Sequence, residues 1–136
     1  MSFDLRLVRV SDCMHHGILS CDSHAPLDEV AAIMATHRVH AVAVTNGDGR
    51  RVVAVVSDID VVVAAAQGDA PTALEVAATE PLAVSAGESV QHAAQLMAEH
   101  GVSHLVVLDP QNGRPTGILS TLDVAALYAD MNGDPQ

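Results

Sequence analysis

A serine and an aspartate three residues apart are the residues of this sequence best suited to hold a ligand. Ser57 precedes Asp60 in one pair, and Ser120 precedes Asp123 in the other. The second pair lies 63 residues after the first. Each pair follows an apolar run typical of a buried strand and opens a run typical of a helix. A carboxylate there can accept two hydrogen bonds from a vicinal diol such as the ribose 2′- and 3′-hydroxyls. The serine hydroxyl can reach the adjacent sugar or phosphate oxygen, and a helix N-terminus attracts negative groups.

The same residues also have a purely structural interpretation. A serine at the start of a helix caps its unpaired N–H groups, and an aspartate in the first turn suits the helix dipole. One Ser-x-x-Asp would therefore indicate only a helix cap. Two copies in register within an internal repeat indicate an organising feature of the fold.

The 63-residue repeat extends well beyond these two pairs. It predicts one domain built from two halves. Other residues that the same offset pairs are Leu19 with Leu82, Ala31 with Ala94, Met34 with Met97, His37 with His100, Val39 with Val102, Val44 with Val107 and Arg51 with Arg114.

Hydrophobic periodicity predicts the same series of elements in each half. Apolar residues at i, i+3, i+4 and i+7 predict helices that begin near Leu27 and Val90, the first ending near His37. Residues 1–10 are expected to form an edge strand or a lead-in arm, 11–14 a short helical turn and 67–74 a joint. Strands are expected at 18–21, 41–44, 52–56, 82–84, 105–108 and 116–119, turns at 46–49 and 109–113, and further helices at 58–66 and 121–128.

The predicted fold is therefore α/β (α+β), with two β-α-β-β-α repeats packed with pseudo-twofold symmetry. The two strand-to-helix corners are expected to face the cleft between the repeats. The small residues Ala54 and Gly117 near the strand ends are expected to let a ring approach the backbone. The expected division is an N-terminal arm over 1–9, repeat 1 over 10–68, repeat 2 over 69–130 and a flexible tail over 131–136.

Composition excludes several classes of function. The formal net charge is −11 and the chain has no lysine, which disfavours nucleic acid and anionic membrane surfaces. One Phe, one Tyr and no Trp leave no aromatic platform for single-stranded nucleic acid. The two cysteines, Cys13 and Cys21, do not form a disulfide framework. No secretory signal or membrane-spanning run is evident, so the cytoplasm is the expected location.

The region from about Val10 to Tyr128 resembles a tandem pair of CBS domains, the module named after cystathionine β-synthase. The residues that carry the resemblance are Asp12-Cys13-Met14, the run from Met97 to Leu105 and the run from Gly117 to Asp123. The resemblance implies a non-enzymatic sensor that binds an adenosine-containing ligand in the cleft and needs no cofactor. It also implies a homodimer. No effector domain is evident, so the expected output goes to an effector protein that the sequence does not name.

The resemblance also implies roles for individual residues. Asp60 and Asp123 would hold ribose, and Ser57 and Ser120 the ribose or phosphate. The residues expected beside them are Asp58 and Thr121, phosphate-facing His40 and Ser103, and the backbone near Ile18 and Leu82, which would meet the adenine.

Departures from the family pattern narrow the expected ligand. Ala43 and Val106 replace a frequent proline, Ala54 replaces a glycine, and Asp58 adds negative charge beside a phosphate position. With few cations to compensate a triphosphate, adenosine, AMP or S-adenosylmethionine is favoured. The second-repeat site, with Gly117 and Thr121, is expected to be the better one.

Three alternatives remain open at the level of sequence. The first is a protein-interaction module that binds no ligand and serves dimerisation or docking. The second is a zinc or nickel sensor built from His37 and His40 with His100 and His104. The third is an enzyme, but no base, nucleophile and oxyanion site converge, so the chain is predicted not to be one.

Overall fold

The computed structural model describes residues 4–47, 51–77 and 82–132, which fall into two compact units. Unit 1 comprises Met1–Gly17 and Leu82–Gln136, and unit 2 comprises Ile18–Pro81. Unit 2 is one continuous stretch of chain. Unit 1 joins the N-terminal residues to the second half of the sequence.

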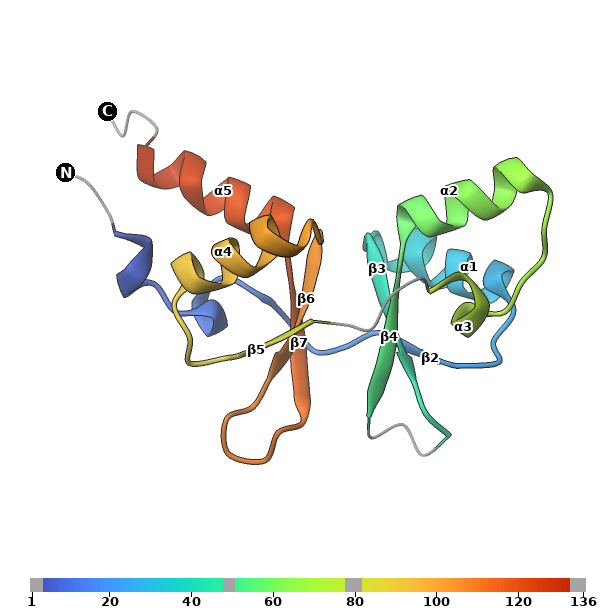
Figure 1. The fold of residues 1–136 in the computed structure, drawn as a ribbon, viewed down its shortest axis with the longest axis horizontal. Coiled ribbons are helices and arrows are strands. Elements are labelled where there is room, and N and C mark those ends of the chain that lie inside the picture. The colour runs from blue at the N-terminus through green and yellow to red at the C-terminus, as the bar shows by residue number, and fades with distance from the viewer. Residues whose placement is uncertain (1–3, 48–50, 78–81, 133–136) are drawn as a thin grey trace. The chain divides into compact units, whose positions relative to one another are not determined.

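Unit 2 contains a three-stranded sheet in the order β2-β3-β4, with β2 parallel and β4 antiparallel to β3 (Figure 1). Its element order confirms the predicted β-α-β-β-α repeat, followed by a short helix that was not predicted. The elements are β2 (Ser20–Asp22), α1 (Leu27–His37), β3 (Ala41–Thr45), β4 (Val52–Ser57), α2 (Asp58–Gln67) and α3 (Ala73–Val76).

Unit 1 repeats this pattern and adds an edge strand from the N-terminal segment. Its sheet has the order β1-β7-β6-β5, with β1 antiparallel to β7. The elements are the 3-10 helices η1 (Leu5–Leu7) and η2 (Val10–Asp12), then β1 (His15–His16), β5 (Ala83–Ser85), α4 (Val90–His100), β6 (His104–Leu108), β7 (Pro115–Ser120) and α5 (Thr121–Asn132).

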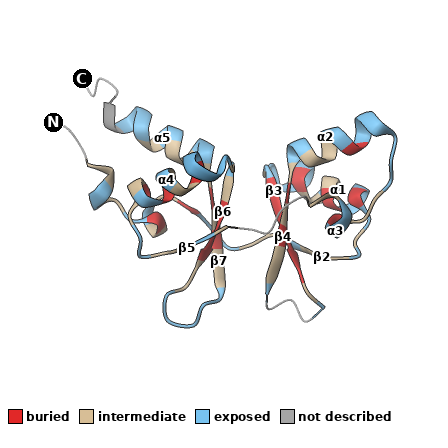
Figure 2. Ribbon diagram, in the orientation of Figure 1, coloured by how far each residue is buried: buried red, intermediate tan, exposed pale blue. Residues whose placement is uncertain are grey.

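The predicted helical stripes form the two cores. In unit 2, Val30 and Met34 of α1 belong to one core with Val42 of β3. Figure 2 shows buried residues on β3, β4 and α1. In unit 1, Met97 of α4 belongs to a core with Leu105 of β6. Burial of each such aliphatic side chain contributes about 1.5–3 kcal/mol. Because Met34 and Met97 are equivalent in the repeat and both are core residues, the sequence repeat is a repeat of core positions.

The two sequence repeats exchange equivalent lead-in segments, which are the short helical turns that begin at Val10 and at Ala73. In unit 1 the Val10 N–H donates to the Glu88 carbonyl at 2.8 Å, and in unit 2 the Ala73 N–H donates to the Ala25 carbonyl at 2.8 Å. The two bonds are equivalent, because the 63-residue offset relates Val10 to Ala73 and Ala25 to Glu88. In each bond, the donor and the acceptor belong to different sequence repeats. Val10 and Ala73 are both fully buried. Each lead-in turn therefore completes the core that contains the other half of the sequence.

The structure corrects several predicted elements. Leu5–Leu7 is a 3-10 helix and not an edge strand, and α5 continues to Asn132 instead of ending at Tyr128. The expected joint over 67–74 contains the start of α3, whose Thr72–Glu75 capping box was readable in the sequence. The turn predicted at 46–49 lies partly outside the described residues, as do 133–136 of the predicted tail.

Candidate functional site

The first Ser-x-x-Asp pair forms the corner between β4 and α2 of unit 2. Asp60 Oδ2 accepts hydrogen bonds from the Ser57 N–H at 2.9 Å and from the Ser57 hydroxyl at 3.0 Å. Both residues are partly buried. These bonds fix the carboxylate in the first helical turn. A carboxylate has about four lone-pair directions, so acceptor capacity is left for a diol.

The second pair forms the same corner between β7 and α5 of unit 1. Asp123 Oδ2 accepts from the Ser120 N–H at 2.8 Å, and the Ser120 hydroxyl accepts from the Asp123 N–H at 3.1 Å. Here the carboxylate has a further neighbour, because His15 Nδ1 lies 3.1 Å from Asp123 Oδ1. The Asp123 side chain is only 10% exposed. Sequence reasoning missed His15.

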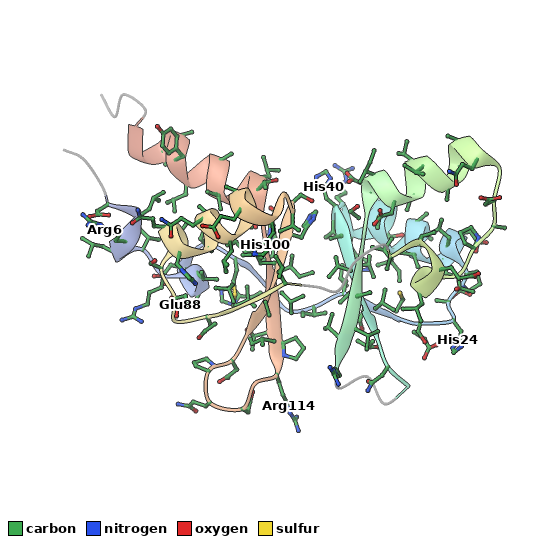
Figure 3. The ribbon with its side chains drawn as sticks, viewed as in Figure 1. Arg6, His24, His40, Glu88, His100 and Arg114 are labelled. Atoms are coloured by element: carbon green, nitrogen blue, oxygen red, sulfur yellow. The ribbon has the colours of Figure 1, made fainter. Side chains whose placement is uncertain are left out.

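The next predicted residues come together at each corner. The Asp58 N–H donates to the His40 carbonyl at 2.9 Å, and the Thr121 N–H donates to the Ser103 carbonyl at 2.9 Å. His40 Nδ1 also lies 2.9 Å from Asp58 Oδ2. Figure 3 shows His40 beside the start of α2. Asp58 therefore has a histidine partner at the corner of unit 2.

Ser103 has a different partner. Its hydroxyl lies 2.9 Å from His104 Nδ1, so the two corners present different side chains at the position predicted to face phosphate. The pattern of sequence does not reveal these pairings. The antiparallel registers, Ala41 with Ser57 and His104 with Ser120, place 40 beside 58 and 103 beside 121.

The predicted adenine-facing residues lie at the same ends of the sheets as the corners. The Leu82 carbonyl accepts from the Val106 N–H at 2.9 Å, and the equivalent bond in unit 2 joins the Leu19 carbonyl to Ala43. Ile18 therefore precedes the true counterpart of Leu82 by one residue. Both Ile18 and Leu82 are partly buried.

The expected role of the small residues near the strand ends is not supported by the packing. A Cβ at Gly117 would lie 2.2 Å from the His15 carbonyl oxygen, so the protein's own backbone fills the space expected for a ring. Ala54 is buried in the core of unit 2. The need for a small residue at both positions is explained by packing within each unit.

Permanent positive charge is scarce around the corners. Arg51 and Arg114 lie at the turn ends of the hairpins, whereas Ser57 and Ser120 lie at the opposite ends of β4 and β7. About five residues of antiparallel strand separate these ends, roughly 17 Å. Arg38 lies two residues before His40.

Burial raises the pKa of the Cys13 thiol, and the charge of Asp123 raises that pKa further. Burial also raises the pKa of Cys21, with smaller contributions from the charges of Asp22 and Glu29. A raised thiol pKa leaves less thiolate at neutral pH. The two cysteines are therefore poor nucleophiles.

A separate groove of about 350 Å³ lies on unit 2, and none of the predicted ligand residues lines it. Its lining is mostly apolar. The lining residues are Pro26, Leu27, Asp28, Ala31, Val61, Ala65, Asp69, Ala70 and Pro71.

Within residues 4–47, 51–77 and 82–132, no three His, Cys, Asp or Glu side chains are arranged to hold a metal ion. The histidines of the metal hypothesis, His37 with His40 and His100 with His104, are divided between the two units. No helix in the described part of the chain is long and apolar enough to cross a membrane.

Comparison with known proteins identifies the repeats. The family model described as "CBS domain" matches twice, at residues 10–67 and 73–130. The chain belongs to the CBS domain family. The two CBS repeats thus follow the internal repeat seen in the sequence. No enzyme family is indicated, and comparison with curated proteins gives no match.

Solved protein structures resemble nearly the whole chain. A CBS domain protein from Pyrobaculum aerophilum complexed with AMP is 31% identical, with a TM-score of 0.81 over 93% of this chain and 100% of that chain. Hypoxic Response Protein I with two coordinated zinc ions is 27% identical, with a TM-score of 0.71 over 89% and 99%.

The CBS domain pair of protein MJ0100, in complex with 5′-methylthioadenosine and S-adenosyl-L-methionine, is 22% identical. Its TM-score is 0.80 over 90% of this chain and 97% of that chain. At that level of identity, the likeness establishes the fold alone. These structures confirm that the chain is a CBS pair.

Proposed function

We propose that this CBS pair is a regulatory module that binds an adenosine-containing ligand at its strand-to-helix corners. The observation that carries the proposal is the pair of aspartates, Asp60 and Asp123, each fixed by a serine at the start of a helix. A carboxylate in this position recognises a ribose diol through two hydrogen bonds. The 31% identical CBS protein complexed with AMP supports the same ligand class.

The charge of the chain supports a ligand with few phosphates. The chain has no lysine, and its hairpin arginines lie away from the corners. A triphosphate would place several negative charges beside Asp58 and Asp60 without a matching set of cations. Adenosine, AMP and S-adenosylmethionine are therefore the proposed ligands, in preference to ATP.

Titration calorimetry with adenosine, AMP, S-adenosylmethionine and ATP tests this function. Asp60→Asn and Asp123→Asn each keep an oxygen for the serine N–H but remove the charge. Loss of charge-assisted hydrogen bonds worth about 1.5–3 kcal/mol weakens binding at the altered corner roughly tenfold to hundredfold. Asp130→Asn, an exposed aspartate of α5, is the matched control and should leave binding unchanged.

The proposal fails if none of these compounds binds, or if the double variant Asp60→Asn and Asp123→Asn binds as tightly as the wild type. Thermal melting of each variant separates lost binding from lost folding. A ligand that binds only the folded state also raises the melting temperature of the wild type by mass action.

A second copy of the chain is the proposed partner. Apolar residues at i, i+3, i+4 and i+7 on α2, beginning with Ile59 and Val62, are exposed, and α5 has the equivalent series beginning with Leu122 (Figure 2). We call these two series the outer helix faces. Despite the net charge of −11, they contain no charged residue. The full series are Ile59, Val62, Val63 and Ala66 on α2, and Leu122, Ala125, Ala126 and Ala129 on α5.

Repeated apolar faces without charge favour self-association, because burying them removes apolar surface from water without desolvating charges. Val62→Glu would place a buried charge in the interface and should convert a dimer to a monomer in light-scattering chromatography. Gln67→Glu, at the end of the same helix, is the control. A wild type that is monomeric at high concentration would contradict the proposed dimer.

A further inference from the structure

The N-terminal segment of unit 1 lies on the corner that contains Asp123. The backbone of β1 pairs with β7, where His15 lies opposite Ile118, and the Gly17 N–H donates to the Thr116 carbonyl at 2.8 Å. The Cys13 thiol lies 3.5 Å from the Asp123 carbonyl oxygen. The segment is therefore fixed on both sides of His15.

This placement brings the imidazole of His15 onto the carboxylate of Asp123. Its Nδ1 lies 3.1 Å from Oδ1 and 3.2 Å from Oδ2. The His15 side chain is 73% exposed, whereas that of Asp123 is 10% exposed. The imidazole is thus the outer, movable member of the pair, and the carboxylate is the inner, fixed member.

The sequence supplies no imidazole at the equivalent position for Asp60. The 63-residue offset pairs His15 with Ala78, whose side chain cannot form a hydrogen bond. The bonds described for the Asp60 carboxylate come from Ser57 of its own corner. The two aspartates occupy the same position of the repeat but differ in what a ligand must displace.

We propose that His15 is a specificity-determining residue of the second-repeat corner, where it competes with the ligand for Asp123. This inference rests on the proposed function, in which the Asp123 carboxylate accepts the ribose hydroxyls. Because both carboxylate oxygens already face Nδ1, a diol binds there only after the imidazole turns away. The second-repeat corner is then the weaker site, the reverse of the order expected from the sequence.

Adenosine binding, measured by calorimetry at pH 7.5, tests this in the Asp60→Asn background, where only the second-repeat corner is intact. His15→Ala should tighten binding several-fold, because the imidazole no longer occupies the Asp123 carboxylate. His16→Ala, the neighbouring exposed histidine, is the matched control and should not change the affinity.

A second variant covers damage to the strand. His15→Gln retains a neutral hydrogen-bond donor, so it should preserve the weak binding that His15→Ala relieves. Binding that is present but equally tight in His15→Ala and its parent overturns this inference and leaves the proposed function standing. Absence of adenosine binding in the wild type and every variant overturns both.

Discussion

At the scale of single residues, the two aspartates show how one sequence position acquires two environments. Asp60 and Asp123 are equivalent in the repeat, and the sequence predicted both as carboxylates in the first turn of a helix that a serine caps. The partner His15 could not be predicted, because it reaches Asp123 through a contact that spans 108 positions of the chain. No local pattern records such a contact. The residue types at a site follow from sequence, but their competition follows from the fold.

The cysteines give a prediction at the same scale. Their raised pKa values mean that both thiols stay protonated above the ordinary thiol value of about 8.5, so alkylation by iodoacetamide should be slow at pH 7. The alkylation rate should rise only at higher pH. In the chain unfolded by urea, the rate should match that of an ordinary thiol at every pH. Asp123→Asn removes one cause of the shift at Cys13, so Cys13 should then react faster while Cys21 does not change. Fast reaction of both thiols at pH 7 would contradict this account.

At the scale of elements, the long periodic helices and the main strands were predicted well, whereas the short elements β1, α3 and η1 were not. The stripe beginning at Leu27 predicted α1 within a residue, since its apolar period is set by burial against the sheet. The two-residue strand β1 has no period to read. Its pairing depends on Gly117 of the distant strand β7. From the sequence, that glycine was expected to make space for a ligand. Short elements are determined by the neighbours that they pack against.

Gly117→Ala tests that pairing directly. The new Cβ would lie 2.2 Å from the His15 carbonyl oxygen, so β1 or β7 must shift. Overpacking of this kind costs about 1–3 kcal/mol in the free energy of unfolding, measured with urea. Gly87→Ala is the control, because its Cβ would make only ordinary contacts, with the Arg9 side chain at 3.7 Å and Ser85 Oγ at 3.9 Å. It should change stability by less than about 0.5 kcal/mol. Equal stability of the two variants would contradict the described β1–β7 pairing.

The C-terminal caps of α1 and α4 give an internal matched pair. Both cap residues are left-handed, with φ of 54° at Arg38 and 64° at Gly101. A side chain in this conformation costs roughly 1–2 kcal/mol, whereas glycine adopts it freely. Arg38→Gly should therefore raise the free energy of unfolding by about 1 kcal/mol, and Gly101→Ala should lower it by a similar amount. Shifts of the same sign in the two variants would exclude backbone strain as the cause.

At the scale of the whole molecule, the exchange of lead-in segments separates sequence repeats from folding units. The repeat boundaries predicted over 10–68 and 69–130 follow sequence similarity, and the family model matches similar ranges. The compact units divide the chain differently. Unit 2 begins at Ile18, and the first lead-in belongs to unit 1, because Val10 is buried in the unit that contains Glu88. A repeat offset reports which residues are equivalent. It cannot report which of two equivalent partners each residue packs against.

This difference predicts the behaviour of two fragments of similar length. Fragment 18–81 contains unit 2 complete, including Ala73 and its bond to the Ala25 carbonyl. Fragment 10–68 lacks Ala73 and exposes Val10, whose partners lie in the second half. Burial of a core aliphatic contributes about 1.5–3 kcal/mol, a large share of the stability of so short a chain. Fragment 18–81 should therefore unfold cooperatively in urea at a higher midpoint.

Val10→Ala and Ala73→Gly in the full chain test which core each lead-in residue stabilises. Truncation of Val10 should increase amide hydrogen exchange in β6 and β7 of unit 1, whereas Ala73→Gly should increase it in β3 and β4 of unit 2. Local opening follows the packing of each unit, so exchange reports which core a lead-in residue supports. If Val10→Ala instead loosened β3 and β4, each lead-in would belong to its own sequence repeat. Fragment 10–68 would then be the folding unit.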